Sequence, residues 1–95
     1  MEYTFVAKIE RFEMQGGWYY VPVPMELSKS VEHHAIHFGF IAINAQVGSS
    51  GWPTSLLPKG DGTYFIALPA RVRKKEKLSL DAEIEISFET RSRRS

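Results

Sequence analysis

Two segments of the chain repeat the same order of residue types at a separation of 45 positions (62 − 17 = 45). Residues 17–24 (GWYYVPVP) and 62–69 (GTYFIALP) each have a glycine, a run of aromatic and aliphatic residues, and a proline. Glycine favours a turn, aromatic and β-branched residues favour a strand, and proline ends a ladder because it donates no hydrogen bond. Each segment precedes a short polar stretch of helical character and a second β-rich run, over residues 40–45 or 82–88. The repeat predicts a mainly β fold with one or two short helices, built by internal duplication of a half-barrel.

The first strands are predicted by hydrophobic alternation. Apolar residues at every second position from Tyr3 to Ile9 are typical of a strand with one face on a core. The glycines at 16 and 17 favour a turn, and residues 18–23 then favour a returning strand. We therefore expect residues 3–23 to form a β-hairpin.

A short helix is predicted after Pro24, because Leu27, Val31 and Ala35 recur at helical spacing. Residues 48–62 are rich in glycine, serine and proline, but their apolar centre predicts a short strand over Thr54 to Leu57. The sequence Lys-Gly-Asp-Gly at 59–62 then favours a hairpin turn.

Length and composition indicate one autonomous domain. A chain of 95 residues with 43% hydrophobic and 24% charged residues is typical of a globular domain. We expect a single β-barrel domain over residues 1–90 and a disordered basic tail over 91–95. The chain has no cysteine, and its longest apolar-leaning run, 38–47, is too short to span a membrane. These features favour a bacterial-type cytoplasmic protein without disulfides or thiolate metal sites.

Several motifs along the chain resemble those of the uncharacterised bacterial family called domain of unknown function nineteen-oh-five. The motifs are Gly17-Trp18, Val23-Pro24, Gly39-Phe40-Ile41, Trp52-x-Thr54-Ser55-Leu56-x-Pro58, Gly60-x-Gly62-x-Tyr64 and Val72-Arg73. The resemblance covers about Tyr3 to Glu89 and implies a small double-split β-barrel. AbrB- and MazE-like transcription factors assemble this architecture from two chains, whereas here the duplication would supply both halves.

The second half also resembles the AbrB element itself. The matching positions are Ile66, Leu68-Pro69, Val72-Arg73, Leu78 and Leu80. The match departs at Glu76, where the pattern has leucine, and at Asp81-Ala82, where it has Gly-Asp. The resemblance implies that Arg73 is the best single candidate for a phosphate or base contact.

A basic cluster in the second half has two interpretations. The cluster comprises Arg71, Arg73, Lys74, Lys75 and Lys77. The aromatic residues that could supply stacking surfaces are Trp18, Tyr19, Tyr20, Trp52, Tyr64 and Phe65. Cations and aromatic rings together can bind single-stranded nucleic acid through phosphates and stacked bases. The favoured alternative is a solvated helix face over a core of strand aromatics, because strand alternation already turns half of these rings inward.

Two further groups are weighed against ordinary structural roles. His33, His34 and His37 have a spacing that suits zinc or nickel, but a hydrated surface cluster is favoured and no metal site is predicted. Ser55 and Lys59 resemble a nucleophile and its base, but no nucleophile elbow or phosphate loop accompanies them. Trp52 is expected to plug one end of the barrel or, if exposed, to anchor a partner.

The function predicted from these residues is a non-enzymatic binding or interaction module without a cofactor. Its expected binding surface consists of Trp52, Thr54, Ser55, Lys59, Arg71, Arg73 and Lys74. The alternative is an AbrB-like nucleic-acid-binding protein, and an enzyme is the least favoured class. The partner is expected to be a nucleic acid or a protein, without membrane association, and neither its identity nor the oligomeric state follows from the sequence.

Overall fold

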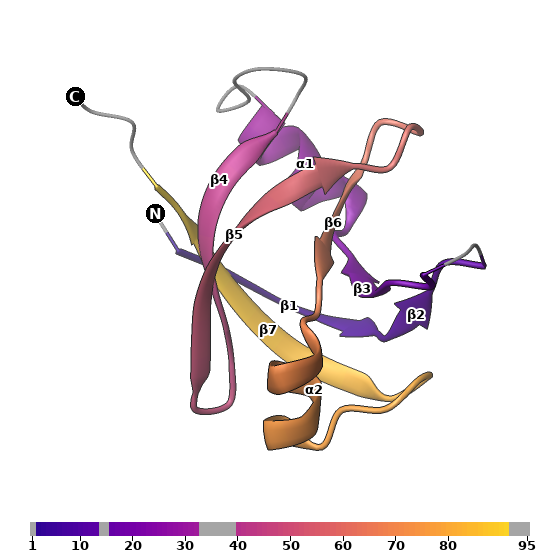
Figure 1. The fold of residues 1–95 in the computed structure, drawn as a ribbon. Coiled ribbons are helices and arrows are strands. Elements are labelled where there is room, and N and C mark those ends of the chain that lie inside the picture. Colours follow the sequence, from indigo (N-terminus) through magenta and orange to yellow (C-terminus); the bar gives the residue numbers. More distant parts are fainter. Residues whose placement is uncertain (1, 14–15, 33–39, 92–95) are drawn as a thin grey trace.

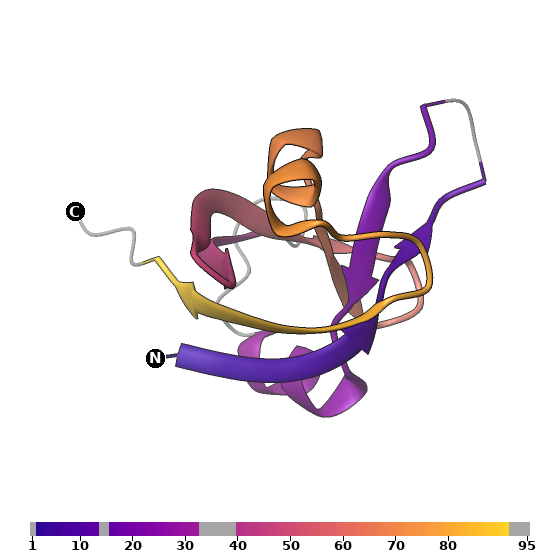
Figure 2. The same cartoon turned by 90° about the horizontal axis from the view of Figure 1, so that it is seen from below.

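In the part of the chain that the structure describes, seven antiparallel strands form one strongly curled half-barrel sheet, and two short helices lie at its opposite ends (Figures 1 and 2). A computed structural model describes residues 2–13, 16–32 and 40–91. The strands are β1 (Glu2–Lys8), β2 (Glu10–Arg11), β3 (Tyr19–Pro22), β4 (Ile41–Val47), β5 (Ser50–Pro58), β6 (Tyr64–Ala67) and β7 (Glu83–Thr90), and the helices are α1 (Met25–Val31) and α2 (Ala70–Glu76). The prediction of a mainly β fold with one or two short helices is confirmed.

The two edge strands of the curled sheet, β1 and β2, follow each other directly in the sequence. The strand order is β1-β7-β4-β5-β6-β3-β2, and only Ile9 separates β1 from β2. The backbone of Ile9 is itself bonded, since its N–H donates to Ala82 O and its carbonyl accepts from Asp81 N, both at 2.9 Å. Figure 2 shows β1 lying along β7. One continuous N-terminal segment therefore serves both edges of the sheet.

The predicted hairpin over residues 3–23 is wrong for most of its length. β1 pairs with β7 over seven residues, from Glu2 opposite Glu89 to Lys8 opposite Glu83. Within residues 3–23 the hairpin is limited to β2 and β3, which pair through Glu10 opposite Tyr20 and Arg11 opposite Tyr19. The longer ladder with a distant strand satisfies more backbone groups than the local hairpin does. The alternation predicted from Tyr3 to Ile9 nevertheless holds, because Phe5 and Ile9 are buried.

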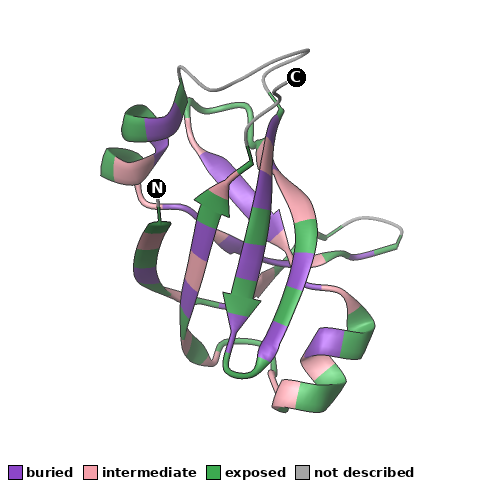
Figure 3. Cartoon of the chain, turned by 90° about the vertical axis from the view of Figure 1, so that its left-hand side faces the viewer, coloured by how far each residue is buried: buried purple, intermediate pink, exposed green. Residues whose placement is uncertain are grey.

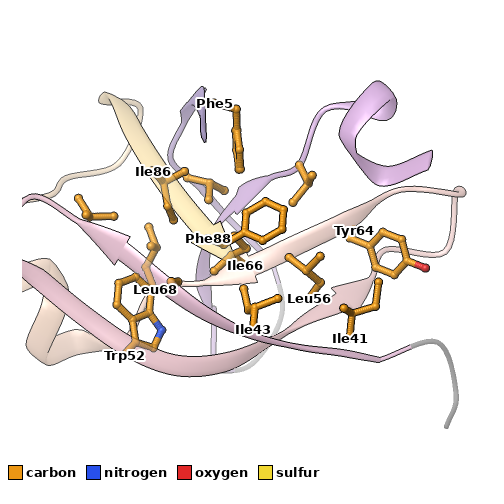
Figure 4. Close-up of a cluster of buried hydrophobic side chains, with 14 of the residues drawn as sticks. Phe5, Ile41, Ile43, Trp52, Leu56, Tyr64, Ile66, Leu68, Ile86 and Phe88 are labelled. Atoms are coloured by element: carbon orange, nitrogen blue, oxygen red, sulfur yellow. The ribbon is translucent and has the colours of Figure 1, made fainter. Parts of the chain in front are cut away.

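The core lies inside the curl. Buried and exposed residues alternate along the strands (Figure 3), most regularly in β4, where Ile41, Ile43, Ala45 and Val47 are buried. Figure 4 shows side chains from β1, β4, β5, β6 and β7 meeting in one cluster. Since each fully buried aliphatic or aromatic side chain contributes roughly 1.5–3 kcal/mol, this cluster supplies most of the driving force for folding.

The strand predicted over Thr54 to Leu57 is longer in the structure, where β5 runs from Ser50 to Pro58. Pro53 lies within it, opposite Asn44 of β4. β5 pairs with β6 only at Leu57 and Pro58, so no β6 ladder is present at Pro53. Pro53 therefore removes no hydrogen bond between β5 and β6, and β5 continues through this proline. The turn predicted at residues 59–62 is confirmed, with Lys59 N donating to Thr63 O at 2.9 Å.

The two repeated segments have matching element bounds. β3 and β6 each have four residues and α1 and α2 each have seven, and both pairs start 45 positions apart (64 − 19 = 45; 70 − 25 = 45). Each helix follows an extended proline, Pro24 or Pro69. Helix α1 confirms the helix expected after Pro24 up to Val31, while Ala35 lies outside the described residues. Neither helix has the length and hydrophobicity that crossing a membrane requires.

Candidate binding hollow between β5 and β6

A hollow opens where β5 and β6 stop pairing. β5 and β6 pair only next to their connecting turn, at Pro58 with Tyr64 and at Leu57 with Phe65. Farther along, β6 pairs with β3, and this ladder extends to Leu68, whose N–H donates to Tyr19 O at 2.9 Å. We call the resulting cavity of about 260 Å³ the Trp18–Arg73 hollow. The residues that line it are Gly16, Gly17, Trp18, Tyr19, Thr54, Ala67, Leu68, Pro69, Ala70 and Arg73.

The guanidinium of Arg73 is held in place at this hollow. Its Cζ lies 4.0 Å from the centroid of the Tyr19 ring, and its Nε donates to Leu68 O at 3.1 Å. A guanidinium stacked on an aromatic face is attracted by the ring quadrupole and loses little freedom when its planar edge then binds a ligand. The arrangement therefore presents an ordered cation.

A second arginine lies against the same ring. Arg11 Cζ is 5.7 Å from the Tyr19 centroid, and Arg11 Nε donates to Gly17 O at 3.4 Å. A Cβ on Gly17 would lie 2.6 Å from Arg11 Nε, and Gly17 also has a φ of +39°. The positive φ favours glycine at this position, and a larger residue would also displace the Arg11 guanidinium. Residues from two distant segments thus converge on Tyr19.

Trp18 is the most exposed aromatic side chain at the hollow, with 55% of its surface accessible. The predicted binding surface omitted it, because the sequence analysis assigned residues 18–23 to a strand. The signal was present in the run Trp18-Tyr19-Tyr20, since three consecutive aromatic side chains of a strand cannot all face one core. In the structure Tyr20 is buried, and Trp18 precedes the strand.

The structure brings two of the predicted binding residues together. Thr54 and Arg73 both line the hollow, Thr54 from β5 and Arg73 from α2. The Thr54 carbonyl also accepts a hydrogen bond from Arg91 Nη2 at 3.1 Å, which anchors the start of the basic C-terminal segment. Residues 92–95 lie outside the described part of the chain.

The other predicted binding residues lie elsewhere. Trp52 is only 4% exposed and belongs to the core, so its side chain is not an exposed anchor for a partner. Ser55 is half-buried opposite Ala42, and Lys59 is exposed with its Nζ 5.5 Å from the Tyr20 ring centroid. Arg71 and Lys74 are exposed on α2.

Helix α2 presents a cationic surface to solvent. Arg71, Lys74 and Lys75 are exposed, and Lys77 follows in a left-handed conformation that ends the helix. Arg71 and Lys75 also line a separate hollow of about 280 Å³ beside Ser49. The predicted cluster is thus partly a solvated helix face and partly, through Arg73, the wall of the Trp18–Arg73 hollow.

The acidic residue of this helix, Glu76, is bound to the turn between β4 and β5. Its Oε2 accepts hydrogen bonds from Ser50 Oγ at 2.6 Å and from Ser49 Oγ at 3.2 Å. The bond from Ser50 is the main cause that lowers the pKa of the Glu76 carboxyl below 4.5. Glu76 therefore ties α2 to the sheet in its charged form.

Stability should depend on pH through Glu76. Because the pKa of Glu76 is lower in the folded state, its contribution is fully present above about 4.5 and is lost as pH falls through the folded pKa. We expect Glu76→Gln to lower Tm at pH 7 and the difference from the unmodified protein to shrink toward pH 3. Thermal unfolding of both proteins between pH 3 and pH 7 measures the difference in Tm. A difference in Tm that does not change with pH would contradict the role of the Glu76 charge.

An aromatic cluster stabilises the β2–β3 end of the sheet. The Phe12 and Tyr20 rings stack with centroids 4.1 Å apart, and Phe65 packs edge-on against both. The Tyr20 hydroxyl donates to Glu10 Oε1 at 2.7 Å. Burial, followed by the bond to Glu10, raises the pKa of Tyr20 to about 12.

Tyr20 should therefore titrate well above an ordinary tyrosine. We expect an NMR titration of the tyrosine Cζ carbons to show a pKa of about 12 for Tyr20, against an ordinary 10.0. Glu10→Gln should lower this pKa, because it removes the charged acceptor. Stability should fall as pH rises from 10 toward 12, since the folded state retains the proton. A Tyr20 pKa near 10 in the folded protein would refute the assignment.

The predicted histidine cluster, His33, His34 and His37, lies outside the described residues. Within residues 2–13, 16–32 and 40–91, no three acidic side chains gather closely enough to hold a metal ion.

Comparison with known proteins identifies a family without an assigned activity. No curated protein matches the chain. A family model matches residues 5–88, which include every described residue that lines the Trp18–Arg73 hollow. The chain belongs to the family described as Domain of unknown function (DUF1905).

Proposed function

We propose that this domain is a non-enzymatic binding module whose ligand occupies the Trp18–Arg73 hollow. The observation that carries the proposal is the Arg73 guanidinium, stacked on Tyr19 at 4.0 Å beside a half-exposed tryptophan. Ligand sites are typically concave and mostly apolar with a few ordered polar groups, and tryptophan, tyrosine and arginine are the side chains enriched in binding hot spots. The hollow combines these features.

The chemistry of the lining residues favours binding over catalysis. Among the described residues of the hollow, the side chains with polar groups are those of Trp18, Tyr19, Thr54 and Arg73. Arginine stays protonated at physiological pH and cannot serve as a general base, whereas catalysis of proton transfer needs a group with a pKa near the working pH. These side chains can orient a ligand without supplying that group.

An NMR screen tests this function. The ¹⁵N-labelled protein is mixed with a library of small aromatic, aliphatic, cationic and anionic compounds, and shifts of the amide and indole signals are mapped. We expect the largest shifts to cluster at Trp18, Tyr19, Thr54 and Arg73. The proposal fails if no compound shifts these signals, or if the shifts cluster on another face.

Nucleic-acid binding is the second candidate, and the exposed cations of α2 favour it. Arg71, Lys74, Lys75 and Lys77 occupy one short segment, whose acidic residue Glu76 accepts hydrogen bonds from Ser49 and Ser50. DNA affinity supplied by these cations should fall steeply with added salt because counterions are released on binding. Lys74→Gln with Lys75→Gln should weaken such binding, and no mobility shift at low salt would exclude it.

We also propose that the fold is a double-split barrel formed by internal duplication and that the two helices are equivalent elements. The support is the common offset of 45 in the bounds of β3 and β6 and of α1 and α2. The β3–β6 register is also symmetric, since the same offset converts the pair Tyr20 and Ala67 into the pair Phe65 and Pro22. An experimental structure in which residues 17–31 and 62–76 do not superpose by one two-fold rotation would contradict duplication.

A further inference from the structure

We infer that the ligand of the Trp18–Arg73 hollow is a small planar aromatic ring bearing a carboxylate or a phosphate. This inference rests on the proposed function, because it names the chemical class of the compound that the hollow binds. It follows from the charge, the stacking surfaces and the size of the hollow.

The charge of the hollow selects an anion. Arg73 is the charged residue among the described lining residues, and no aspartate or glutamate accompanies it there. Its Nε is used by Leu68 O, whereas its terminal nitrogens form no hydrogen bond with any other described residue. The terminal nitrogens of a guanidinium match the two oxygens of a carboxylate or phosphate. An anionic group thus has a partner at the hollow that a neutral group lacks.

The aromatic surfaces select a planar ring. Trp18 is 55% exposed at the hollow, and Pro69 and Ala70 add apolar surface. Exposed indole favours offset or edge-on contact with another ring, which adds to the area that is buried. An aliphatic anion of the same charge would gain the contact with Arg73 but not the contact between rings.

The size of the hollow limits the ligand. Its volume of about 260 Å³ lies below the roughly 300–1,000 Å³ typical of sites for drug-sized ligands. One or two fused rings with one anionic group fit this range. The lining threonine, Thr54, offers a hydroxyl that can donate to the anion or accept from a ring substituent.

The test compares three compounds that share one ring system. 1-Naphthoate, 1-naphthyl phosphate and neutral 1-naphthamide are titrated into the ¹⁵N-labelled chain of 95 residues while the Trp18 indole signal is followed. We expect at least one of the two anions to bind at least about tenfold more tightly than the amide, because hydrogen bonds to charged groups are stronger than neutral ones. The order of the two anions identifies the preferred anionic group.

Variants assign the difference to Arg73. Arg73→Gln should reduce the preference for the anions to about that of the amide, and Arg73→Lys should lose part of it because lysine lacks the planar fork. Arg71→Gln, which removes an exposed cation of the same helix outside the hollow, is the matched control and should leave the preference unchanged.

The outcomes separate this inference from the proposed function. Equal affinity for the amide and both anions in the unmodified protein overturns the anionic class without relying on any variant. Library compounds that bind the hollow while neither naphthyl anion does also overturn it and leave the binding function intact. If no compound of the library binds the hollow, the inference and the proposed function fail together.

Discussion

Replacing Trp52 by alanine should lower the free energy of unfolding by about 3–5 kcal/mol, the range for removal of a large buried aromatic side chain. Trp52 is 4% exposed and packs in the same cluster as Leu68 and Ile43 (Figure 4). Alanine would remove the buried indole and leave a cavity that surrounding strands cannot fill. Denaturant unfolding followed by circular dichroism measures the change, and a loss below about 1 kcal/mol would mean that Trp52 is not a core residue.

The variant Trp52→Phe separates packing from hydrogen bonding. The indole Nε1 is buried and has no hydrogen-bond partner among the described residues. A buried donor without a partner opposes folding, so its removal offsets part of the packing that phenylalanine loses. We expect Trp52→Phe to cost well under half as much as Trp52→Ala. Equal losses would contradict the expectation that phenylalanine retains most of the packing of the indole.

Replacing Ser28 by alanine should cost about 1–3 kcal/mol, although it removes only one oxygen atom. Ser28 is fully buried in α1, where its Oγ donates to Val23 O at 3.4 Å and accepts from Tyr64 N at 3.3 Å. Alanine would leave the Tyr64 N–H without this partner in a site that excludes water. The loss of a desolvated partner, rather than the loss of volume, is the expected cause.

Ser30→Ala is the matched control for this variant. Ser30 lies in the same helix, but it is exposed and donates to Glu26 O at 3.0 Å. Water can replace that bond, so the change in the free energy of unfolding should stay within about 0.5 kcal/mol. Denaturant unfolding of both variants gives the comparison. Similar losses in the two would contradict the buried bridge that the Ser28 hydroxyl makes between Val23 and Tyr64.

Local elements of the fold could be predicted from the sequence. The turn at residues 59–62 and the two segments that end at Pro24 and Pro69 depend on glycine and proline, whose backbone preferences act over a few residues. Alternation likewise identified the core-facing side chains of the first segment, Phe5 in β1 and Ile9 directly after it. These predictions succeeded because each needed no knowledge of a distant partner.

Predictions that depended on pairing failed or were incomplete. The partner of β1 is β7, with Glu2 opposite Glu89, and no local pattern identifies a strand at the far end of the chain. Pro53 lies in the segment 48–62, whose glycine, serine and proline content predicted only a short strand. The strand β5 nevertheless continues through Pro53, because β6 does not pair with β5 at that position. The same gap forms the hollow, so the juxtaposition of Trp18 with Arg73 follows from tertiary structure alone.

The most direct test of the central claim is an intermolecular NOE experiment on the protein with whichever of 1-naphthoate and 1-naphthyl phosphate binds more tightly. The Trp18–Arg73 hollow predicts contacts from the naphthyl protons to the Trp18 indole and to the Thr54 methyl group. A separate hollow of about 320 Å³ on the sheet, lined by Asn44 and Ser87 among others, is the comparison surface. Contacts at Trp18 and Thr54 are the predicted result, whereas contacts only at Asn44 and Ser87 would contradict the account.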